Sequence, residues 1–242
     1  MRKAGDGKSF HIYALGNAVI FLTLAALFIA AFAGGGAIAA AGNSRAYYRG
    51  NSEKPYVSLM INVYTGGEYI EPMMRVFEEY GVKATFFIGG SFAMRNGALV
   101  KKICENGHEI GNHGYYHRSP EKLSYKENYD EIIMNHRLIE EICGIKMTLF
   151  APPSGSVGKE MFKASADLGY DVIMWSKDTI DWRDKDPNLT FERAVKNLKN
   201  GDLVLMHPTA HTLEALPKIL RFYKDNKFQE VTVSKNISKE TV

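Results

Sequence analysis

The chain has 242 residues, a formal net charge of +3 and 45% hydrophobic residues. This composition is typical of a globular protein and excludes a disordered, collagen-like or low-complexity chain. Residues 1–54 carry a balance of +4, so the rest of the chain sums to −1. A nearly neutral domain gives no reason to expect nucleic-acid binding.

The first predicted element is an apolar segment near the N-terminus. Residues 13–33 are almost wholly apolar, and no charged residue lies between Lys8 and Arg45. About 20 such residues can cross the hydrocarbon core of a bilayer, whereas a cleavable signal peptide usually has an apolar run of about 7–15. We therefore predict an uncleaved transmembrane signal anchor over 13–33. A cleaved signal is the alternative, because residues 37–42 are small enough for a signal peptidase.

This segment divides the chain into a short tail (1–12), the anchor (13–33), a polar linker (34–54) and one domain (55–242). Charges on the two sides of the anchor nearly balance, so they do not fix its orientation. The short leading segment is typical of exported chains. We expect a single-pass protein of the cell membrane with its domain on the extracytoplasmic side.

Apolar runs and amphipathic stretches alternate along the domain. Strands are predicted at residues 57–63, 84–88, close to the run 107–117, and at 147–150, 172–175, 203–206 and 230–233. Helices are predicted at residues 69–80, 98–106, 125–143, 160–168, 191–198 and 213–224. This order implies parallel pairing and an α/β fold, and seven strands favour a (β/α) barrel, either complete or incomplete.

Polar side chains gather where the predicted strands end, which is where β/α barrels hold their active sites. His113 and His117 are four residues apart, and on a helical turn both imidazoles would reach one metal ion. His207 follows an apolar strand, and Asp181 precedes Trp182. Each feature alone is also explained by surface or packing residues, but their common place at strand ends favours a site.

The two cysteines are too few for a disulfide framework. Cys104 and Cys143 each lie in a segment predicted to be an amphipathic helix. Buried thiols are the favoured interpretation, and one bridge stays open for an exported protein.

The ordered motifs resemble the polysaccharide deacetylases, also called the NodB homology domain or carbohydrate esterase family 4. The resemblance covers about Val57 to Val233 and is carried by the stretches 83–89, 107–117, 178–182 and 205–207. It is similar to the sporulation-associated branch of the family. The resemblance implies a distorted seven-stranded barrel that removes N-acetyl groups from peptidoglycan or chitin-like glycans.

The resemblance also implies roles for individual residues. His113 and His117 would bind a divalent metal, with zinc the first choice, and His207 would protonate the leaving amine. Asp181 would orient His207 and support its charged form. The implied substrate-binding residues are Trp182, Pro152 and Tyr116.

Three positions depart from the family pattern. Asn62 and Val63 stand where the family has two aspartates, so the usual base and one metal ligand are absent. Ala151 replaces the arginine that would position the base. Glu68 is the candidate to supply a ligand or base instead, although a glutamate in a helix's first turn has a structural explanation in the helix dipole.

Three functions follow from this mixture of retained and lost groups. The first is an altered, metal-assisted deacetylase of cell-wall or spore glycan. The second is a catalytically impaired domain that binds glycan through aromatic side chains. The third is a membrane-anchored structural protein of the envelope with a vestigial cleft.

Overall fold

The computed structural model describes residues 46–238, so the predicted tail, the signal anchor and most of the linker lie outside the described residues. Within residues 46–238, no helix is long and apolar enough to cross a membrane. The strands are β1 (Ala46–Tyr47), β2 (Tyr56–Val63), β3 (Thr85–Ile88), β4 (Glu109–Asn112), β5 (Leu149–Phe150), β6 (Asp171–Ile173), β7 (Lys177–Asp178), β8 (Asp202–Met206) and β9 (Gln229–Glu230).

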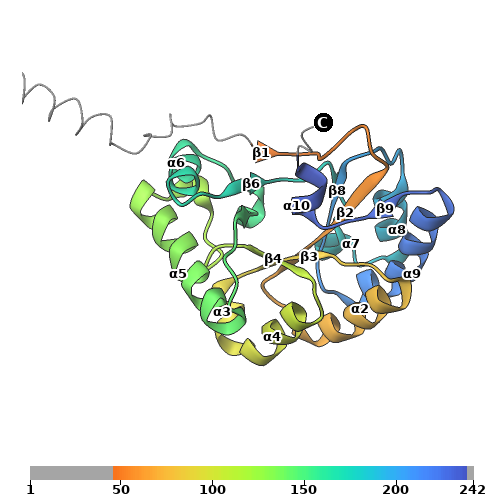
Figure 1. Cartoon of the computed structure of the whole chain (residues 1–242), viewed down its shortest axis with the longest axis horizontal. Coiled ribbons are helices and arrows are strands. Elements are labelled where there is room, and N and C mark those ends of the chain that lie inside the picture. The colour runs from red at the N-terminus through yellow and green to blue at the C-terminus, as the bar shows by residue number, and fades with distance from the viewer. Residues whose placement is uncertain (1–45, 239–242) are drawn as a thin grey trace, which may run out of the picture. The chain divides into compact units, whose positions relative to one another are not determined.

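Helices connect these strands and cover one side of the sheet (Figure 1). They are α2 (Gly67–Tyr80), α3 (Gly90–Arg95), α4 (Gly97–Glu105), α5 (Tyr125–Cys143), α6 (Lys159–Asp167), α7 (Asp181–Asp184), α8 (Pro187–Val195), α9 (Ala210–Asp225) and α10 (Val233–Ile237). Two short 3₁₀ turns lie at Pro120–Lys122 and Pro153–Gly155.

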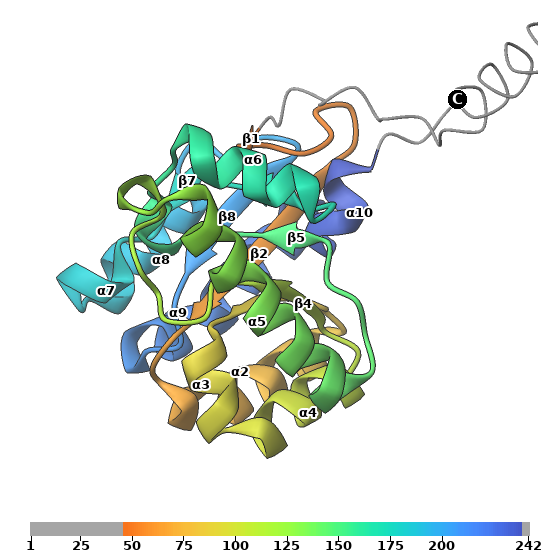
Figure 2. The same cartoon turned by 90° about the vertical axis from the view of Figure 1, so that its left-hand side faces the viewer.

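The strands form one parallel, curled sheet in the order β1-β6-β5-β4-β3-β2-β8-β7, with β9 beside β2. Residues 171–178 lie at both ends of this path, because β6 pairs with β5 and β7 pairs with β8. Ser176 bridges the gap by donating its backbone N–H to the carbonyl of Leu203 (3.1 Å). The sheet therefore curls into a parallel α/β half-barrel, which confirms the α/β class and the parallel pairing but is more open than the predicted seven-stranded barrel (Figure 2).

Alternation along the strands divides the core into two layers. On the concave side, Met60, Phe87 and Leu203 pack inside the half-barrel. Their neighbours Ile61, Phe86 and Val204 pack against the helices on the other side. The end of the half-barrel where the strands begin is capped by α10, whose Val233 N–H donates to Thr85 Oγ1 at 2.9 Å. The opposite end, where the strands finish, holds the cavity described below.

Helix α5 shows how local sequence sets an element. Ser124 and Glu127 form a capping box, in which each side chain accepts the other residue's backbone N–H. Gly144 ends the helix in the left-handed conformation, with φ of 69°. The helix therefore has the bounds predicted from the sequence.

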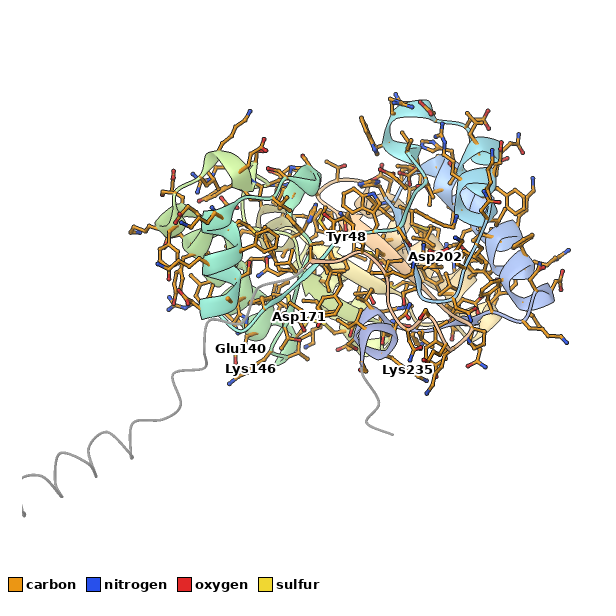
Figure 3. The ribbon with its side chains drawn as sticks, turned by 90° about the horizontal axis from the view of Figure 1, so that it is seen from above. Tyr48, Glu140, Lys146, Asp171, Asp202 and Lys235 are labelled. Atoms are coloured by element: carbon orange, nitrogen blue, oxygen red, sulfur yellow. A yellow bond between two sulfur atoms is a disulfide. The ribbon has the colours of Figure 1, made fainter. Side chains whose placement is uncertain are left out.

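The short helices α3 and α7 were not predicted, and three further segments differ from the prediction. Residues 46–54, assigned to the linker, belong to the half-barrel, because β1 pairs with β6 and Arg49 forms an ion pair with buried Asp202 (Nη1 to Oδ1, 2.6 Å). Figure 3 shows Asp202 and Tyr48 within this part of the fold. The strand expected at 230–233 is confined to β9, and Val233 already begins α10. Strand β7 was not predicted, because two residues are too few to show a period.

The two cysteines form a disulfide, so the preferred interpretation as buried thiols is wrong. Cys104 lies near the end of α4 and Cys143 ends α5, and these helices pack together. Their Cα atoms are 6.3 Å apart, within the usual range for a disulfide. Sequence spacing alone could not reveal this, since the two residues are 39 positions apart.

Candidate functional site

A cavity of about 590 Å³ lies at the carboxyl ends of the strands. This volume is within the ~300–1,000 Å³ typical of small-molecule sites. Its lining comprises Asn62, Tyr64, Thr65, His113, His117, Ser154, Gly155, Trp175, Asp178, Trp182, Leu205, His207, Pro208 and Thr209. The cavity thus gathers residues from the segments that follow β2, β4, β5, β6, β7 and β8, as the strand-end pattern predicts.

His113 and His117 meet in the loop after β4. This loop is not helical, contrary to the expected helical turn, but it still brings the two ring centroids to 5.0 Å. His113 is buried, and its Nδ1 donates to the carbonyl of Ala151 at 2.8 Å. His117 has a left-handed backbone (φ 58°), and its ring lies 4.7 Å from that of Tyr64.

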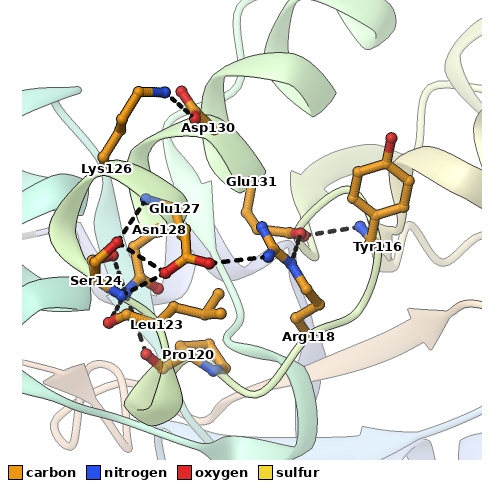
Figure 4. Close-up of polar contacts among 10 residues, drawn as sticks. All are labelled: Tyr116, Arg118, Pro120, Leu123, Ser124, Lys126, Glu127, Asn128, Asp130 and Glu131. Atoms are coloured by element: carbon orange, nitrogen blue, oxygen red, sulfur yellow. Dashed lines mark hydrogen bonds and ion pairs between the residues drawn. The ribbon is translucent and has the colours of Figure 1, made fainter.

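Buried Glu131 of α5 fastens this loop (Figure 4). Its Oε2 accepts the backbone N–H groups of Tyr115 (2.8 Å) and Tyr116 (2.7 Å). Its Oε1 accepts from Nε of Arg118 at 2.7 Å, which compensates the buried charge. One carboxylate therefore holds the backbone just before His117 and the side chain of the residue just after it.

Burial also sets the charge of the two imidazoles. Burial, aided by the nearby His117, lowers the pKa of His113 to about 3. Burial likewise lowers the pKa of His117. Both rings are therefore neutral near pH 7, and the Nδ1–H bond of His113 leaves its Nε2 as an acceptor.

On the other side of the cavity, His207 pairs with Asp181. His207 Nδ1 lies 2.8 Å from Asp181 Oδ1, and its backbone N–H donates to Oδ2 at 2.7 Å. The Thr212 hydroxyl donates to Oδ2 at 2.6 Å, the third hydrogen bond to Asp181. Burial raises the pKa of Asp181, but these bonds from His207 and Thr212 outweigh it, so the pKa is lowered overall. Asp181 thus stays ionised and contacts His207 through two hydrogen bonds, while its role in the reaction stays a prediction.

Three cavity loops hold non-glycine residues in the left-handed region. These are His117 (φ 58°), Ser154 (φ 57°) and Ile180 (φ 53°), which directly precedes Asp181. Such backbone costs of order 1–3 kcal/mol per residue and is most unusual for a β-branched side chain. The loops that form this cavity therefore contain strained backbone that lowers the stability of the fold.

The three departures from the family pattern have different surroundings. Asn62 lines the cavity and is only 4% exposed, and its Oδ1 has no hydrogen-bond partner. The side chain of Val63 lies on the opposite face of the sheet from the cavity, where it packs in the core against the helices. Ala151 faces the inside of the half-barrel, where its methyl group is fully buried.

The side chains at these positions do not supply the three metal ligands that the resemblance implies. His113 and His117 supply two imidazoles, but Val63 supplies no third ligand. Within residues 46–238, no group of three or more His, Cys, Asp or Glu side chains could hold a metal ion. The amide oxygen of Asn62 is neutral, and zinc sites draw their oxygen ligands from carboxylates.

The remaining predicted site residues are spread more widely. Trp182 lines the cavity and is 58% exposed. Pro152 is buried and Tyr116 is exposed, and neither is among the lining residues. Glu68 is exposed in the first turn of α2, also outside the lining. Its place fits the helix-dipole explanation better than that of a ligand or base.

Sequence reasoning missed several residues that shape the site. Tyr64 and Trp175 line the cavity, and their positions just after β2 and β6 could have marked them. Glu131 and Thr212 lie within helices, and no local signal distinguishes them from other helix residues. Their roles become visible only through contacts made across the fold.

Comparison with known proteins adds to this geometry. Residues 49–173 match the polysaccharide deacetylase family. YlxY, an uncharacterized protein of Bacillus subtilis, is 39% identical over 77% of this chain, which spans only 59% of YlxY. A peptidoglycan-N-acetylglucosamine deacetylase of Bacillus cereus is 33% identical over 69% of this chain and 80% of its own length.

Solved structures include a similar protein described as a pseudoenzyme. BA3943, a CE4 family pseudoenzyme from Bacillus anthracis, superposes with a TM-score of 0.80 at 34% identity, covering 83% of this chain and 71% of BA3943. A BA3943 mutant described as having restored enzymatic activity superposes equally well, with a TM-score of 0.80 at 33% identity over 83% of this chain and 74% of the mutant. The chain therefore belongs to the polysaccharide deacetylase family.

Proposed function

We propose that this protein binds cell-wall glycan in its cavity without efficient hydrolysis. The observation that carries the proposal is Asn62, because an amide with an unpaired oxygen stands where the family has its base. An amide cannot take a proton from water near neutral pH, and losing a general base typically costs about 10²–10⁴ in rate. The likeness to a CE4 family pseudoenzyme supports the same conclusion.

Glycan binding is supported by the walls of the cavity. Tyr64, Trp175 and Trp182 all line it, and aromatic faces pack well against sugar rings. The B. cereus relative acts on peptidoglycan N-acetylglucosamine, and we extend that polymer class to this chain as a ligand. The left-handed residues His117, Ser154 and Ile180 support a cavity whose shape still serves a purpose.

The test is to measure binding and turnover on the same samples. Full-length protein in detergent is titrated calorimetrically with chitotetraose, N-acetylchitotetraose and peptidoglycan fragments, while released acetate is assayed in parallel. We expect saturable binding of at least one glycan and no acetate above the protein-free background. Absence of binding to every glycan would overturn the proposal and leave a structural envelope role.

A second candidate is slow, metal-assisted deacetylation. It is favoured by the intact pair of Asp181 and His207, which keeps a proton donor for a leaving amine. Acetate release that requires added zinc, stops with EDTA and falls in His207→Ala would support this candidate over binding alone. Glu68→Gln provides a matched control, because Glu68 lies outside the cavity lining.

We also propose that the domain is held on the extracytoplasmic face of the cell membrane. The apolar run at residues 13–33 supports an anchor. The disulfide between Cys104 and Cys143 supports an oxidising compartment, since such bonds are rare in reducing cytosol. A protease-protection assay on intact cells tests this, and a domain protected until the membrane is opened would contradict it.

A further inference from the structure

The cavity wall carries a carboxylate but no permanent cation. Asp178 is the single carboxylate among the lining residues, and within residues 46–238 no lysine or arginine lines the cavity. One oxygen of Asp178 accepts the backbone N–H of Ile180 at 2.8 Å. Within the same described range, Asp178 takes part in no ion pair. A ligand in the cavity therefore meets a negative side chain that no adjacent ammonium or guanidinium group covers.

Two arginines of the α7 and α8 region are engaged by other groups of the protein. Arg183 attracts Asp178 over a longer distance, but its guanidinium binds Asp184 (Nε to Oδ1, 2.6 Å). Arg193 binds the same Asp184 and donates to the carbonyl of Thr179 at 2.9 Å. Neither arginine is among the lining residues. Both guanidinium groups therefore meet oxygens of the protein rather than a ligand in the cavity.

The lining histidines add no permanent charge. Imidazole groups are almost entirely neutral at pH 8, and a proton bound by His207 at lower pH would be balanced by buried Asp181, 2.8 Å from its Nδ1. Arg118, which follows His117, is bound by two carboxylates of α5 and lies outside the lining. The walls of the cavity are therefore neutral or negative toward a ligand.

Polar groups of both kinds are available to an uncharged ligand. Four lining side chains carry N–H or O–H donors that bind no other described residue, and these are Trp175, Trp182, Thr65 and Ser154. Nε2 of His113 presents a lone pair, because the Nδ1 of this ring donates to a backbone carbonyl at 2.8 Å. The hydroxyl and N-acetyl groups of a sugar both donate and accept, so they can pair with this mixed lining.

The two sugars of peptidoglycan differ in a group that such walls distinguish. N-acetylglucosamine is uncharged, whereas N-acetylmuramic acid carries a lactyl ether that ends in a carboxyl group. Where no peptide is attached, this carboxyl group is an anion near neutral pH. Moving an anion out of water is costly unless a cation or several donors pair with it, and a like charge close by adds to the cost. Asp178 supplies that like charge.

We propose that the cavity selects the uncharged N-acetylglucosamine residues of cell-wall glycan and rejects muramoyl residues whose carboxylate is free. Asp178 is the specificity-determining residue, because it is the lining group that repels the anion. This inference rests on the proposed glycan-binding function and names the sugar that the site takes. The basis of selection is charge, so a muramoyl residue whose carboxyl group is masked as an amide is not rejected in this way.

The experiment compares three tetrasaccharides of equal length. They are N-acetylchitotetraose, the peptide-free tetrasaccharide in which N-acetylglucosamine and N-acetylmuramic acid alternate, and the same alternating sugar with its carboxyl groups converted to methylamides. Full-length protein in detergent is titrated calorimetrically with each at pH 8, in 0.15 M salt with EDTA to remove metal ions that would attract carboxylates. We expect N-acetylchitotetraose to bind about tenfold more tightly than the free acid. The methylamide should bind within about threefold of N-acetylchitotetraose, because it keeps the lactyl group without its charge.

Two variants test the charge of the wall directly. Asp178→Asn keeps an oxygen for the Ile180 N–H but removes the charge, so the preference should fall to about threefold or less. Thr65→Lys adds a cation at an exposed lining residue and should bring the free acid to at least the affinity of N-acetylchitotetraose. Asp171→Asn is the matched control, because it removes one negative charge at the exposed start of β6, away from the cavity (Figure 3). This control should leave the preference unchanged.

Equal or tighter binding of the free acid by the wild-type protein would overturn the inference but leave glycan binding intact. A methylamide that binds as weakly as the free acid would also overturn it, because the bulk of the lactyl group would then be the cause. The same holds if Asp171→Asn abolishes the preference as fully as Asp178→Asn, or if both Asp178→Asn and Thr65→Lys keep it in full. If none of the three sugars binds, the proposed function falls and this inference falls with it.

Discussion

The two sides of the cavity contrast sharply. On one side, Asp181 and His207 keep the arrangement needed for proton donation, and Asp181 is tied into the core through Thr212. On the other, Asn62, Val63 and Ala151 stand where the family resemblance places the base, a metal ligand and the positioning arginine. The comparison indicates that replacing a side chain bound into a buried hydrogen-bond network lowers folding stability. A side chain needed only for catalysis can be replaced while the fold is kept.

The imidazoles of His113 and His117 combine features of the retained groups and of the replaced ones. His113 is held by the backbone carbonyl of residue 151, which any side chain at that position would leave in place. Its position is therefore independent of the arginine-to-alanine change. The predictions below test this contrast between bonds that maintain the fold and groups that served only the reaction.

The largest effect is expected from breaking the Asp181 network. Asp181→Ala would leave the backbone N–H of His207 and the hydroxyl of Thr212 without their buried acceptor. We expect the free energy of unfolding to fall by about 3–5 kcal/mol, measured by urea denaturation. Asp225→Ala, on the exposed end of α9, should stay within about 0.5 kcal/mol. Equal losses in the two variants would show that Asp181 is not part of the fold's support.

The next effect concerns pH. The pKa of His113 is lowered to about 3 in the folded protein, while an unfolded histidine titrates near 6.5. Below about pH 6.5 the unfolded state therefore binds a proton that the folded state refuses. Stability from this group is fully present above about pH 6.5 and is lost as the pH falls toward 3, by up to about 1.4 kcal/mol per pH unit.

His113→Asn isolates this effect, since an asparagine amide can still donate to the Ala151 carbonyl but does not titrate. The unfolding free energy of wild type and variant should be measured from pH 8 to 4.5. We expect a flatter profile for the variant below pH 6.5. Parallel profiles would contradict a buried neutral imidazole at this position.

A smaller effect is expected at Glu131. Glu131→Gln removes the charge that accepts from Tyr115, Tyr116 and Arg118 at once. Stability should fall by about 1–2 kcal/mol, and glycan affinity by about threefold to tenfold, because the loop of His117 loosens. Glu127→Gln removes a second partner of Arg118 on the exposed side and should leave affinity unchanged. Unchanged glycan affinity in Glu131→Gln would show that the loop carrying His117 keeps its conformation without the Glu131 carboxylate.

The smallest effect on stability is expected at Trp182. Its side chain is 58% exposed, so Trp182→Ala should change the free energy of unfolding by less than about 0.5 kcal/mol. Glycan affinity should nevertheless drop by about tenfold if the indole packs against a sugar ring. A loss of stability without loss of affinity would indicate a packing role instead.

Sequence patterns predicted the parts of the fold that local chemistry determines. Strand β2 is largely apolar, and α5 has both its capping box and its final glycine in the sequence. The rule that chemistry lies at strand ends correctly placed His113, His117 and His207 around one cavity. The chemical roles of these residues stay predictions.

The rest depends on contacts between distant segments. The strand β1 has only two residues, too few to recognise, and it forms because β6 offers an edge. The disulfide needs α4 and α5 to pack side by side. The unpaired oxygen of Asn62 could not be foreseen, because it depends on every neighbour that fails to donate to it.

The most direct test of the account is acetate release by wild type and by the double variant Asn62→Asp with Val63→Asp. Both proteins are assayed with N-acetylchitotetraose and added zinc, after circular dichroism has shown that both are folded. The account predicts no acetate from wild type and measurable release from the double variant, since the lost groups lie at these two positions. Equal turnover by the two proteins would contradict it.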